Sequence, residues 1–182
     1  MKKNLISSAI AVIVFTVLLG IAYPLAMTGV AQVAFPKKAS GDMTLIAKDT
    51  KGNPRYFAPR PSQTGYNPNG TFFSNRGPNQ ASARYFYRDQ LAAYIALNGP
   101  DNPGLTNAKV PADAVTTSGS GVDPHISVDN ARIQARRVAQ VRGIPLARVN
   151  QLVDDSTDGR FLGVLGEPGV NVTTLNLALD TA

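Results

Sequence analysis

The sequence contains no cysteine and no tryptophan, and it has one histidine, His125, and one glutamate, Glu167. The absence of thiols excludes disulfide bonds, cysteine-ligated zinc, iron–sulfur clusters and cysteine nucleophiles, and it leaves the redox compartment open. A zinc site needs about three protein ligands, which argues against one built on a lone imidazole. Glu167 has no obvious carboxylate companion, which argues against a glycosidase pair. The composition therefore points away from independent catalysis.

Charged side chains are missing from one long stretch, Asn4–Pro36, although the whole chain carries a net charge of +6 from 18 basic and 12 acidic residues. Within this stretch, Leu5–Tyr23 is nearly continuous in apolar residues. A helix rises about 1.5 Å per residue and needs about 20 apolar residues to cross a hydrocarbon core of about 30 Å. The pattern predicts a transmembrane helix over residues 5–27, after a short cytoplasmic tail of residues 1–4.

A cleaved secretory signal is the alternative for this segment. Signals also begin with basic residues such as Lys2 and Lys3, and Gly29-Val30-Ala31 resembles a weak cleavage site. The apolar region of a signal is typically about 7–15 residues long, which is shorter than the run in this chain. We therefore expect a retained anchor.

The orientation of the anchor follows only weakly from charge, because the lysines before it are balanced by Lys37, Lys38, Lys48 and Lys51 after it. A short tail is poorly translocated, whereas a long following domain crosses largely regardless of its charge. We expect a single-pass protein of the inner or plasma membrane. Its amino terminus would be cytoplasmic, and residues 28–182 would form an extracytoplasmic domain on the periplasmic side.

Small residues recur at four-residue spacing along the predicted anchor. The pairs are Ser7 with Ala11, Thr16 with Gly20, and Ala22 with Ala26. This spacing lets a second helix approach closely in lipid, although small residues are common in any apolar helix. Ser7, Ala11, Thr16 and Gly20 are therefore candidate contacts with a membrane partner.

The hydrophilic part begins with residues 37–80, which are rich in glycine, proline, asparagine and serine and predict loops with brief strands. A helix is predicted over residues 82–98, because apolar positions there follow the i, i+4, i+7, i+8 pattern of one helix face. These positions are Tyr87, Leu91, Tyr94 and Ile95. Asn98-Gly99-Pro100 supplies a stop signal.

A second helix is predicted between Ser127, as its N-cap, and Gly143, as its terminator. Its inner face would hold Ala131, Ala135, Val138 and Arg142, and its outer face Arg132, Arg136 and Arg137. A third, short helix is predicted from Pro145 to Asp154-Asp155. Its buried residues would be Leu146, Val149, Leu152 and Val153.

The tail alternates in apolar residues, which predicts a strand with a bulge near Thr173-Thr174. The alternating positions are Val170 and Val172, followed in the opposite phase by Leu175, Leu177 and Leu179. Strands and helices are thus intermixed along the hydrophilic part. The fold class expected is an α+β (mixed α/β) extracytoplasmic domain tethered by one N-terminal transmembrane helix.

The most unusual stretch, Val115–Ser127, combines glycines and hydroxyls before a helix, as phosphate-binding loops do. It lacks the lysine followed by serine or threonine of a Walker loop, so a structural turn is the favoured interpretation. His125 with Asp123 and Ser118 or Ser120 suggests a hydrolase triad, but the Gly-x-Ser-x-Gly elbow is missing. We expect His125 to form hydrogen bonds at the helix entry or to lie in an interface.

Two charged clusters have ordinary interpretations. Asp154, Asp155 and Asp158 lie outside EF-hand spacing, so they predict a solvated acidic turn rather than a cation site. Arginines along a helix follow phosphates in nucleic-acid-binding proteins, but those of the second predicted helix have no interleaved aromatic residues. They predict a solvated face, or one that docks on an acidic partner, and no nucleic acid.

A series of short blocks occurs in a fixed order along nearly the whole chain. They are the anchor with Tyr23-Pro24, then Tyr56-Phe57, Arg60-Pro61-Ser62, Tyr66-Asn67-Pro68, Ser74-Asn75, Gly77-Pro78, Val115–Ser127, Arg137-Val138-Ala139, Leu162-Gly163, Gly166-Glu167-Pro168, Val170-Asn171-Val172 and Leu175-Asn176-Leu177-Ala178-Leu179-Asp180. The series resembles the C-subunit family of the bacterial Kdp potassium-transporting ATPases (KdpC). Arg76, where an apolar residue is usual, and a shorter region before Tyr56 depart from the family pattern.

The resemblance implies an accessory subunit of a high-affinity, ATP-driven potassium import complex. In such a complex a channel-like A subunit carries potassium, a P-type ATPase B subunit hydrolyses ATP through an aspartyl phosphate, and a small F subunit is also present. The family's C subunit is described as a catalytic chaperone that raises the ATP affinity of the B subunit, and also as a cap over the outer potassium entrance. ATP and potassium would then be handled by the complex, with no cofactor bound directly by this chain and no catalytic residue of its own.

Polar residues in the loops rich in glycine and proline are candidate contacts with these subunits, or else ordinary turn residues. They are Ser74, Asn75, Asp123 and His125. One alternative hypothesis stays open from the residues alone. It is a membrane-anchored binding module or hydrolase of the cell envelope that is active without partners.

Overall fold

The computed structural model describes residues 2–36 and 41–182 of the 182-residue chain. Lys37 and Lys38, which enter the charge balance around the anchor, lie outside the described residues. The chain divides into two compact units, Met1–Met43 and Thr44–Ala182. A single 3₁₀ turn, η2 (Met43–Leu45), lies at their boundary.

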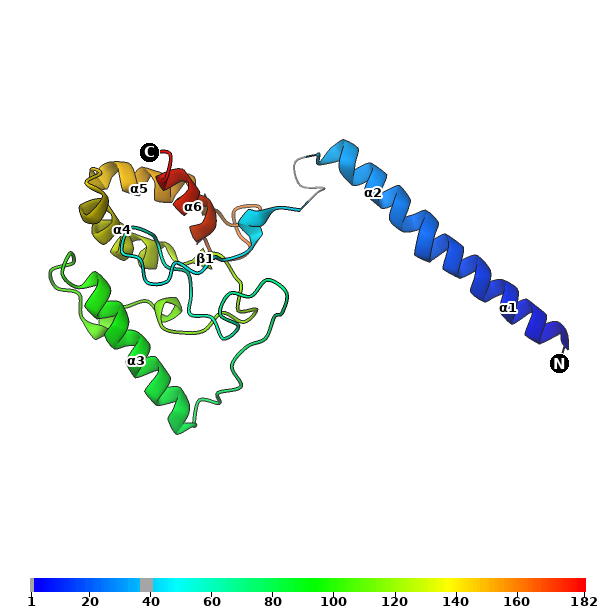
Figure 1. Cartoon of the computed structure of the whole chain (residues 1–182), viewed down its shortest axis with the longest axis horizontal. Helices are drawn as coiled ribbons and strands as arrows, with labels where there is room; N and C mark the ends of the chain where they lie inside the picture. The colour runs from blue at the N-terminus through cyan, green and yellow to red at the C-terminus, as the bar shows by residue number, and fades with distance from the viewer. Residues whose placement is uncertain (1, 37–40) are drawn as a thin grey trace. The chain divides into compact units, whose positions relative to one another are not determined.

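The first unit contains one long apolar helix (Figure 1). It consists of α1 (Lys2–Val17), a π-helical turn η1 (Leu18–Ala22) and α2 (Tyr23–Ala34). The ring of Pro24 removes one backbone donor and crowds the preceding turn, and the wider π turn lies directly before it. By length and composition the 33-residue helix Lys2–Ala34 is a candidate membrane span, and none of its apolar window is buried.

The second unit is a mixture of helices and a small sheet (Figure 1). In chain order its elements are α3 (Ala81–Asn98), η3 (Asn107–Lys109), η4 (Ala112–Ala114), β1 (His125–Ile126), α4 (Val128–Arg142), α5 (Leu146–Asp155), β2 (Thr157–Asp158), β3 (Gly169–Asn171) and α6 (Val172–Leu179). The predicted mixed α and β class is therefore confirmed for this unit.

The sheet has the strand order β1-β3-β2, and both pairings are antiparallel. His125 and Ile126 pair with Asn171 and Val170, while Thr157 pairs with Val170 from the other side. The sheet therefore brings together the start of α4, the end of α5 and the start of α6. The hydrophobic core is formed by Phe57, Ile126, Ala131, Ala135, Val138, Ala139, Val149, Leu152, Val153, Val170, Val172, Leu175 and Leu179.

The three predicted helices are confirmed as α3, α4 and α5. Ser127 caps α4 by accepting a hydrogen bond from the Asn130 N–H at 3.2 Å. Gly143 ends α4 in the left-handed region at a φ of 69°, which glycine adopts without steric cost. The described part of the first loop region, residues 41–80, contains no strand, so the brief strands predicted there are wrong.

The predicted strand in the tail is also wrong beyond Asn171, because residues 172–179 form α6. The Asn171 side chain accepts from the Thr174 N–H at 3.0 Å and so caps this helix. Leu175 and Leu179 are buried, four residues apart, whereas Leu177 is 52% exposed. The alternation of leucines in the sequence thus reflects one buried helix face and one exposed leucine, not the two faces of a strand.

Arg137, predicted on the outer face of the second helix, is instead only 1% exposed. Its Nε donates to Asn98 Oδ1 at 2.9 Å, and its Nη2 donates to Tyr56 O and Gln134 Oε1 at 3.0 Å each. Its Nη1 donates to Pro54 O. Burial lowers the pKa of Arg137 to about 10, which leaves the guanidinium charged at neutral pH.

The acceptors around Arg137 are backbone carbonyls and side-chain amides, all of them neutral. The described residues place no carboxylate in an ion pair with this guanidinium. A buried cation is tolerated when its donors are all satisfied, and the planar fork of arginine suits several acceptors at once. Arg137 thereby ties the loop at Pro54 and Tyr56 to α3 and α4.

We expect Arg137→Lys to lower the free energy of unfolding by about 3–5 kcal/mol, because a lysine ammonium cannot reach all of these acceptors. Arg136→Lys, at the neighbouring exposed position, is the matched control and should change it by less than about 0.5 kcal/mol. Urea unfolding of the full chain in detergent micelles, followed by circular dichroism, compares the two. Equal effects in both variants would show that Arg137 does not hold the loop to the helices.

Candidate functional site

The Val115–Ser127 segment forms a closed turn around the buried Ser118. The Ser118 hydroxyl accepts from the Gly121 N–H at 3.1 Å, and the Ser118 N–H donates to Pro61 O at 2.9 Å. The Ser62 hydroxyl donates in turn to Gly121 O at 2.6 Å. These groups satisfy each other across two loops, which is the structural turn that the sequence favours over a phosphate-binding loop.

His125 lies between two carboxylates. Its Nδ1 is 3.2 Å from Asp123 Oδ1, and its Nε2 is 3.0 Å from Asp158 Oδ2. The second contact exists because β1 and β2 flank β3 in the sheet. A histidine that serves as the base of a hydrolase triad directs one ring nitrogen at the nucleophile. Both nitrogens of His125 face carboxylates, so the geometry does not favour the hydrolase hypothesis.

The polar candidates in the loops lie along one chain of contacts. Ser74 Oγ is 3.3 Å from Thr117 Oγ1, and Arg60 Nη2 donates to Thr117 O at 3.2 Å. Arg60 Nη1 lies 4.0 Å from Asp123 Oδ2, and the other oxygen of Asp123 contacts His125 Nδ1. Asn75 follows Ser74 and lines a hollow of about 280 Å³ beside it. The structure thus brings three of the four candidates to the turn and places Asn75 next to them.

The four candidates on the apolar helix are all exposed within the first unit. Ala11, Thr16 and Gly20 line one shallow groove, together with Val12, Phe15 and Leu19. Ser7 is not among the residues that line this groove. A Cβ added at Gly20 would meet no atom within 4 Å, so this side of the helix is open to a second helix.

One surface feature has no signal in the sequence pattern: an apolar hairpin over residues 161–165. Phe161 N–H donates to Leu165 O at 2.8 Å, and Leu165 N–H donates to Phe161 O at 3.0 Å. An ion pair between Arg160 and Glu167, at 2.8 Å, closes its base. Its large side chains are exposed by 69% for Phe161, 78% for Leu162, 71% for Val164 and 57% for Leu165. Contiguous apolar patches of this kind mark interaction sites.

Leu162 adds strain to this exposure. Its φ is 53°, in the left-handed region where a branched side chain costs roughly 1–2 kcal/mol. Asparagine or glycine would adopt this conformation more readily. A strained leucine whose side chain is 78% exposed is the feature that motivates a search for a partner.

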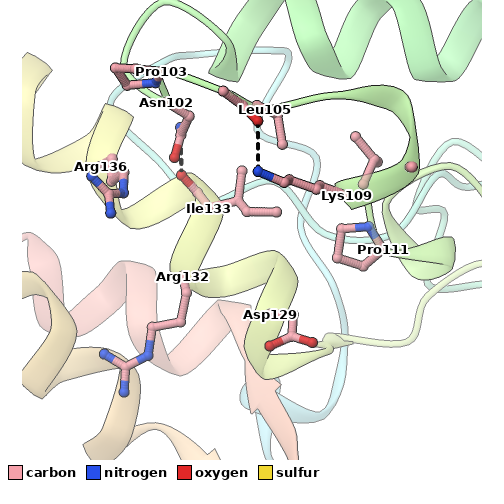
Figure 2. A pocket seen from close by; sticks show the side chains of 12 residues that line it. Asn102, Pro103, Leu105, Lys109, Pro111, Asp129, Arg132, Ile133 and Arg136 are labelled. Carbon is pink, nitrogen blue, oxygen red and sulfur yellow. Dashed lines mark hydrogen bonds between the residues drawn. The ribbon is translucent and has the colours of Figure 1, made fainter.

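A cavity of about 620 Å³ lies between α4 and the loop 102–111 (Figure 2). Asn102 Nδ2 donates to Ile133 O at 3.0 Å, and Lys109 Nζ donates to Gly104 O at 3.0 Å. Arg132 on its wall pairs with Asp154 of α5 at 2.5 Å. Two of the four charged side chains that line this cavity, Lys109 and Arg132, are therefore engaged with neighbours, and we assign the cavity no chemistry.

Two carboxylates of the acidic turn at residues 154–158 are engaged with other elements of the unit. Asp154 forms an ion pair with Arg132, and Asp158 Oδ2 lies within hydrogen-bond distance of His125 Nε2. Within residues 2–36 and 41–182, no cluster of three or more histidine or acidic side chains is arranged to hold a metal ion.

Comparison with known proteins gives consistent matches over nearly the whole chain. A family model described as "KdpC: K+-transporting ATPase, c chain" matches residues 5–181. The chain is 47% identical to the potassium-transporting ATPase KdpC subunit of Rhodospirillum rubrum, covering 99% of this chain and 96% of that protein. It is 44% identical to the KdpC subunit of Mycobacterium tuberculosis, covering 99% of both chains. It is 42% identical to that of Caldanaerobacter subterraneus, covering 92% of this chain and 89% of that protein.

We expect Gly121→Ala to destabilise the protein by about 2–4 kcal/mol, because the turn depends on glycine at this position. Gly121 has a φ of +78°, and a Cβ there would lie 2.7 Å from the Thr64 side chain and 3.2 Å from Phe72 O. Gly119→Ala is the matched control, since a Cβ at Gly119 meets nothing within 4 Å. Urea unfolding of the full chain in detergent measures both. A loss as large in Gly119→Ala would contradict this account of the turn.

Alkaline pH is expected to destabilise the second unit through two half-buried phenols, those of Tyr66 and Tyr94. Tyr66 donates to Arg60 O and Tyr94 donates to Asn130 Oδ1, each at 2.9 Å. Burial, and next the charge of Asp49, raises the pKa of Tyr66 from 10.0 to about 12. Burial also raises the pKa of Tyr94. Folded-state pKa values above the unfolded ones give stability that is complete below about pH 10 and lost as pH rises through about 12.

The measurement is the free energy of unfolding of the full chain in detergent as a function of pH. Tyr66→Phe should reduce its fall between about pH 10 and pH 12, because one linked proton is removed. Tyr85→Phe is the control, since Tyr85 is 56% exposed. A pH dependence that is identical in both variants and the wild type would rule out Tyr66 as its source.

Proposed function

Because the chain belongs to the KdpC family, the c chains of potassium-transporting ATPases, we propose that it is an accessory subunit of an ATP-driven potassium import complex. In this proposal it stabilises the assembly and assists the subunit that hydrolyses ATP. The observation that carries the proposal is the extent of the family match, residues 5–181, which includes both the apolar helix and the following domain. A shared domain alone would leave the role open, whereas a shared arrangement of anchor and domain favours a shared role.

The proposed partners are a channel-like A subunit that carries potassium, a P-type ATPase B subunit and a small F subunit. The helix supports contacts inside lipid, because Ala11, Thr16 and Gly20 leave a groove along one side of it. The apolar hairpin (161–165) supports contacts outside lipid, because its exposed side chains have the size and grouping of an interface anchor. Each surface lies on a different unit of the chain, so the proposal gives the subunit two attachment regions.

The proposed topology has residues 1–4 in the cytoplasm, residues 5–27 in the membrane and residues 28–182 on the extracytoplasmic side. The apolar helix is long enough for such a span. The short basic tail favours a cytoplasmic amino terminus, since it would be translocated poorly. This placement puts the turn around Ser118 and the hairpin on the side from which potassium enters.

The chain is proposed to act without catalytic residues of its own. Cytoplasmic ATP cannot contact an extracytoplasmic domain, so an effect on ATP affinity must be a coupling free energy transmitted through the helix or the partner subunits. The engagement of both His125 ring nitrogens by carboxylates agrees with a role for this residue in fixing the sheet rather than in chemistry.

Co-isolation of the tagged full chain with the ATPase subunits tests the proposal. Membranes from potassium-limited cells would be extracted in mild detergent and the retained subunits quantified by mass spectrometry. Recovery of no potassium-transporting ATPase subunit with the wild-type chain would refute the proposed function.

Leu162→Asn tests the hairpin as a contact region and is expected to lower subunit recovery by about tenfold, the effect of losing one apolar interface anchor. Its unfolding free energy should stay level or rise by up to about 1 kcal/mol, because asparagine adopts the left-handed conformation readily. Leu177→Asn, at a leucine 52% exposed on α6, is the matched control and should leave recovery unchanged. Equal recovery with both variants would exclude the hairpin from the assembly contacts.

A further inference from the structure

Aromatic and arginine side chains occur on the first half of α3 and on residues 72–76, which precede it. We define the α3 surface as Phe72, Phe73, Arg76, Arg84, Tyr85, Tyr87 and Arg88. Phe72, Phe73 and Tyr85 are 56%, 61% and 56% exposed. The chain has only 7 phenylalanines and 6 tyrosines, so the concentration of exposed rings at this one place is unusual. Aromatic residues and arginine are the types enriched at protein interfaces.

The first half of α3 packs little against the rest of its unit. Of the residues Ala81–Asp89, only Ala83 is buried. Figure 1 shows the N-terminal end of α3 projecting from the other helices of its unit. An amphipathic helix gains most of its stability from packing one face against a core. A projecting, ring-bearing helix end is therefore a surface that still lacks its packing partner.

The charge of the α3 surface is strongly one-sided. Between Asn67 and Asn98 the sequence has three arginines, one aspartate, and no lysine or glutamate. Asp89 is paired with Arg88 at 2.8 Å. Arg76 donates to the neutral Gln63 Oε1 at 3.1 Å, and the Arg84 guanidinium has no side-chain partner in the described part of the chain. The surface therefore lacks the negative charge that would balance it.

We propose that the α3 surface docks on an acidic extracytoplasmic surface of another subunit of the same ATPase. This inference rests on the proposed function and adds to it the chemistry of one contact. Carboxylates of the partner would pair with Arg84 and with the remaining Nη1 group of Arg88, whose Nε and Nη2 donate to Asp89. An apolar side chain would fill the hollow beside Phe72 and Phe73. That hollow also has Ser74 and Asn75 in its lining, two of the residues selected from sequence as partner contacts.

The arrangement of rings and guanidinium groups favours a protein over a lipid surface as the occupant. A helix that lies on lipid separates its apolar residues from its charged ones on opposite faces. On the α3 surface they are stacked together: Arg88 lies 5.2 Å from the centre of the Tyr85 ring, and Arg76 lies 4.3 Å from the centre of the adjoining Phe86 ring. Arg88 already donates from Nε and Nη2 to Asp89 Oδ1, whereas the guanidinium of Arg84 is open to a bidentate carboxylate pair. Such geometry recognises a defined acidic surface.

Cross-linking within the intact assembly identifies the occupant. The chain has no native cysteine, so Tyr85→Cys introduces a single thiol on the α3 surface. The full chain carrying this thiol, labelled with a photo-crosslinker in the purified assembly, should join to one ATPase subunit at a segment rich in aspartate or glutamate. Cross-links to lipid alone, or to no subunit of the assembly, would overturn the proposal.

Charge reversal supplies the second measurement. Arg84→Glu combined with Arg88→Glu should lower the cross-link yield about tenfold or more, because two attractive pairs become repulsive. Arg148→Glu, at an exposed arginine of α5, is the matched control and should leave the yield unchanged. Both changes are at exposed positions, so the unfolding free energy should stay within about 0.5 kcal/mol of the wild type. Arginine in place of the cross-linked acidic residue should restore the yield of the double variant.

The outcomes separate this inference from the proposed function. If the wild-type chain recovers no ATPase subunit, the proposed function fails and the α3 contact fails with it. If the wild-type assembly forms, but the double reversal and Arg148→Glu give the same cross-link yield as the wild type, the α3 contact alone is wrong. A loss that is equally large in Arg148→Glu would mean that general charge rather than the α3 surface guides assembly, and it would also overturn the inference.

Discussion

The second unit depends on one buried guanidinium. Arg137 holds carbonyls of Pro54 and Tyr56 from a loop, Asn98 at the end of α3 and Gln134 on α4. A loop without regular structure has no ladder of its own to fix its course, so these bonds replace the missing secondary structure. With the loop fixed, Phe57 enters the core and the following residues meet the turn around Ser118. One interior cation thus fixes the loop at residues 54–56 against α3 and α4.

Polar groups bonded within the domain and exposed apolar side chains lie on different parts of the molecule. Polar groups that could carry chemistry, such as Ser118 and His125, are engaged with neighbours inside the domain. The apolar hairpin and the first half of α3, by contrast, expose large side chains to solvent. This division is typical of a subunit whose free surfaces exist for assembly, and it agrees with the family to which the chain belongs.

Much of the regular structure could be predicted from local signals. Ser127 and Gly143 bound α4 because capping depends on neighbouring residues alone. Burial of Arg137 could not be predicted, because its acceptors lie up to 83 residues away in the sequence. A charged side chain is by default expected on the surface. The strand prediction for the tail was wrong because its leucines fit two patterns. Their spacing of two residues is typical of a strand, but Leu175 and Leu179, four residues apart, also fit one face of a helix. The exposed hairpin at residues 161–165 could not be predicted, because the exposure of its apolar side chains depends on tertiary packing and not on local sequence.

The small size of the sheet limits intermolecular strand pairing between copies of the domain. β1 and β2, the outer strands in the order β1-β3-β2, have only two residues each. An open strand edge invites pairing with another polypeptide, and the risk grows with the length of the unpaired edge. Edges this short offer almost no template for cross-β addition. Many copies of the domain can therefore stand side by side at high local density without joining through their backbones.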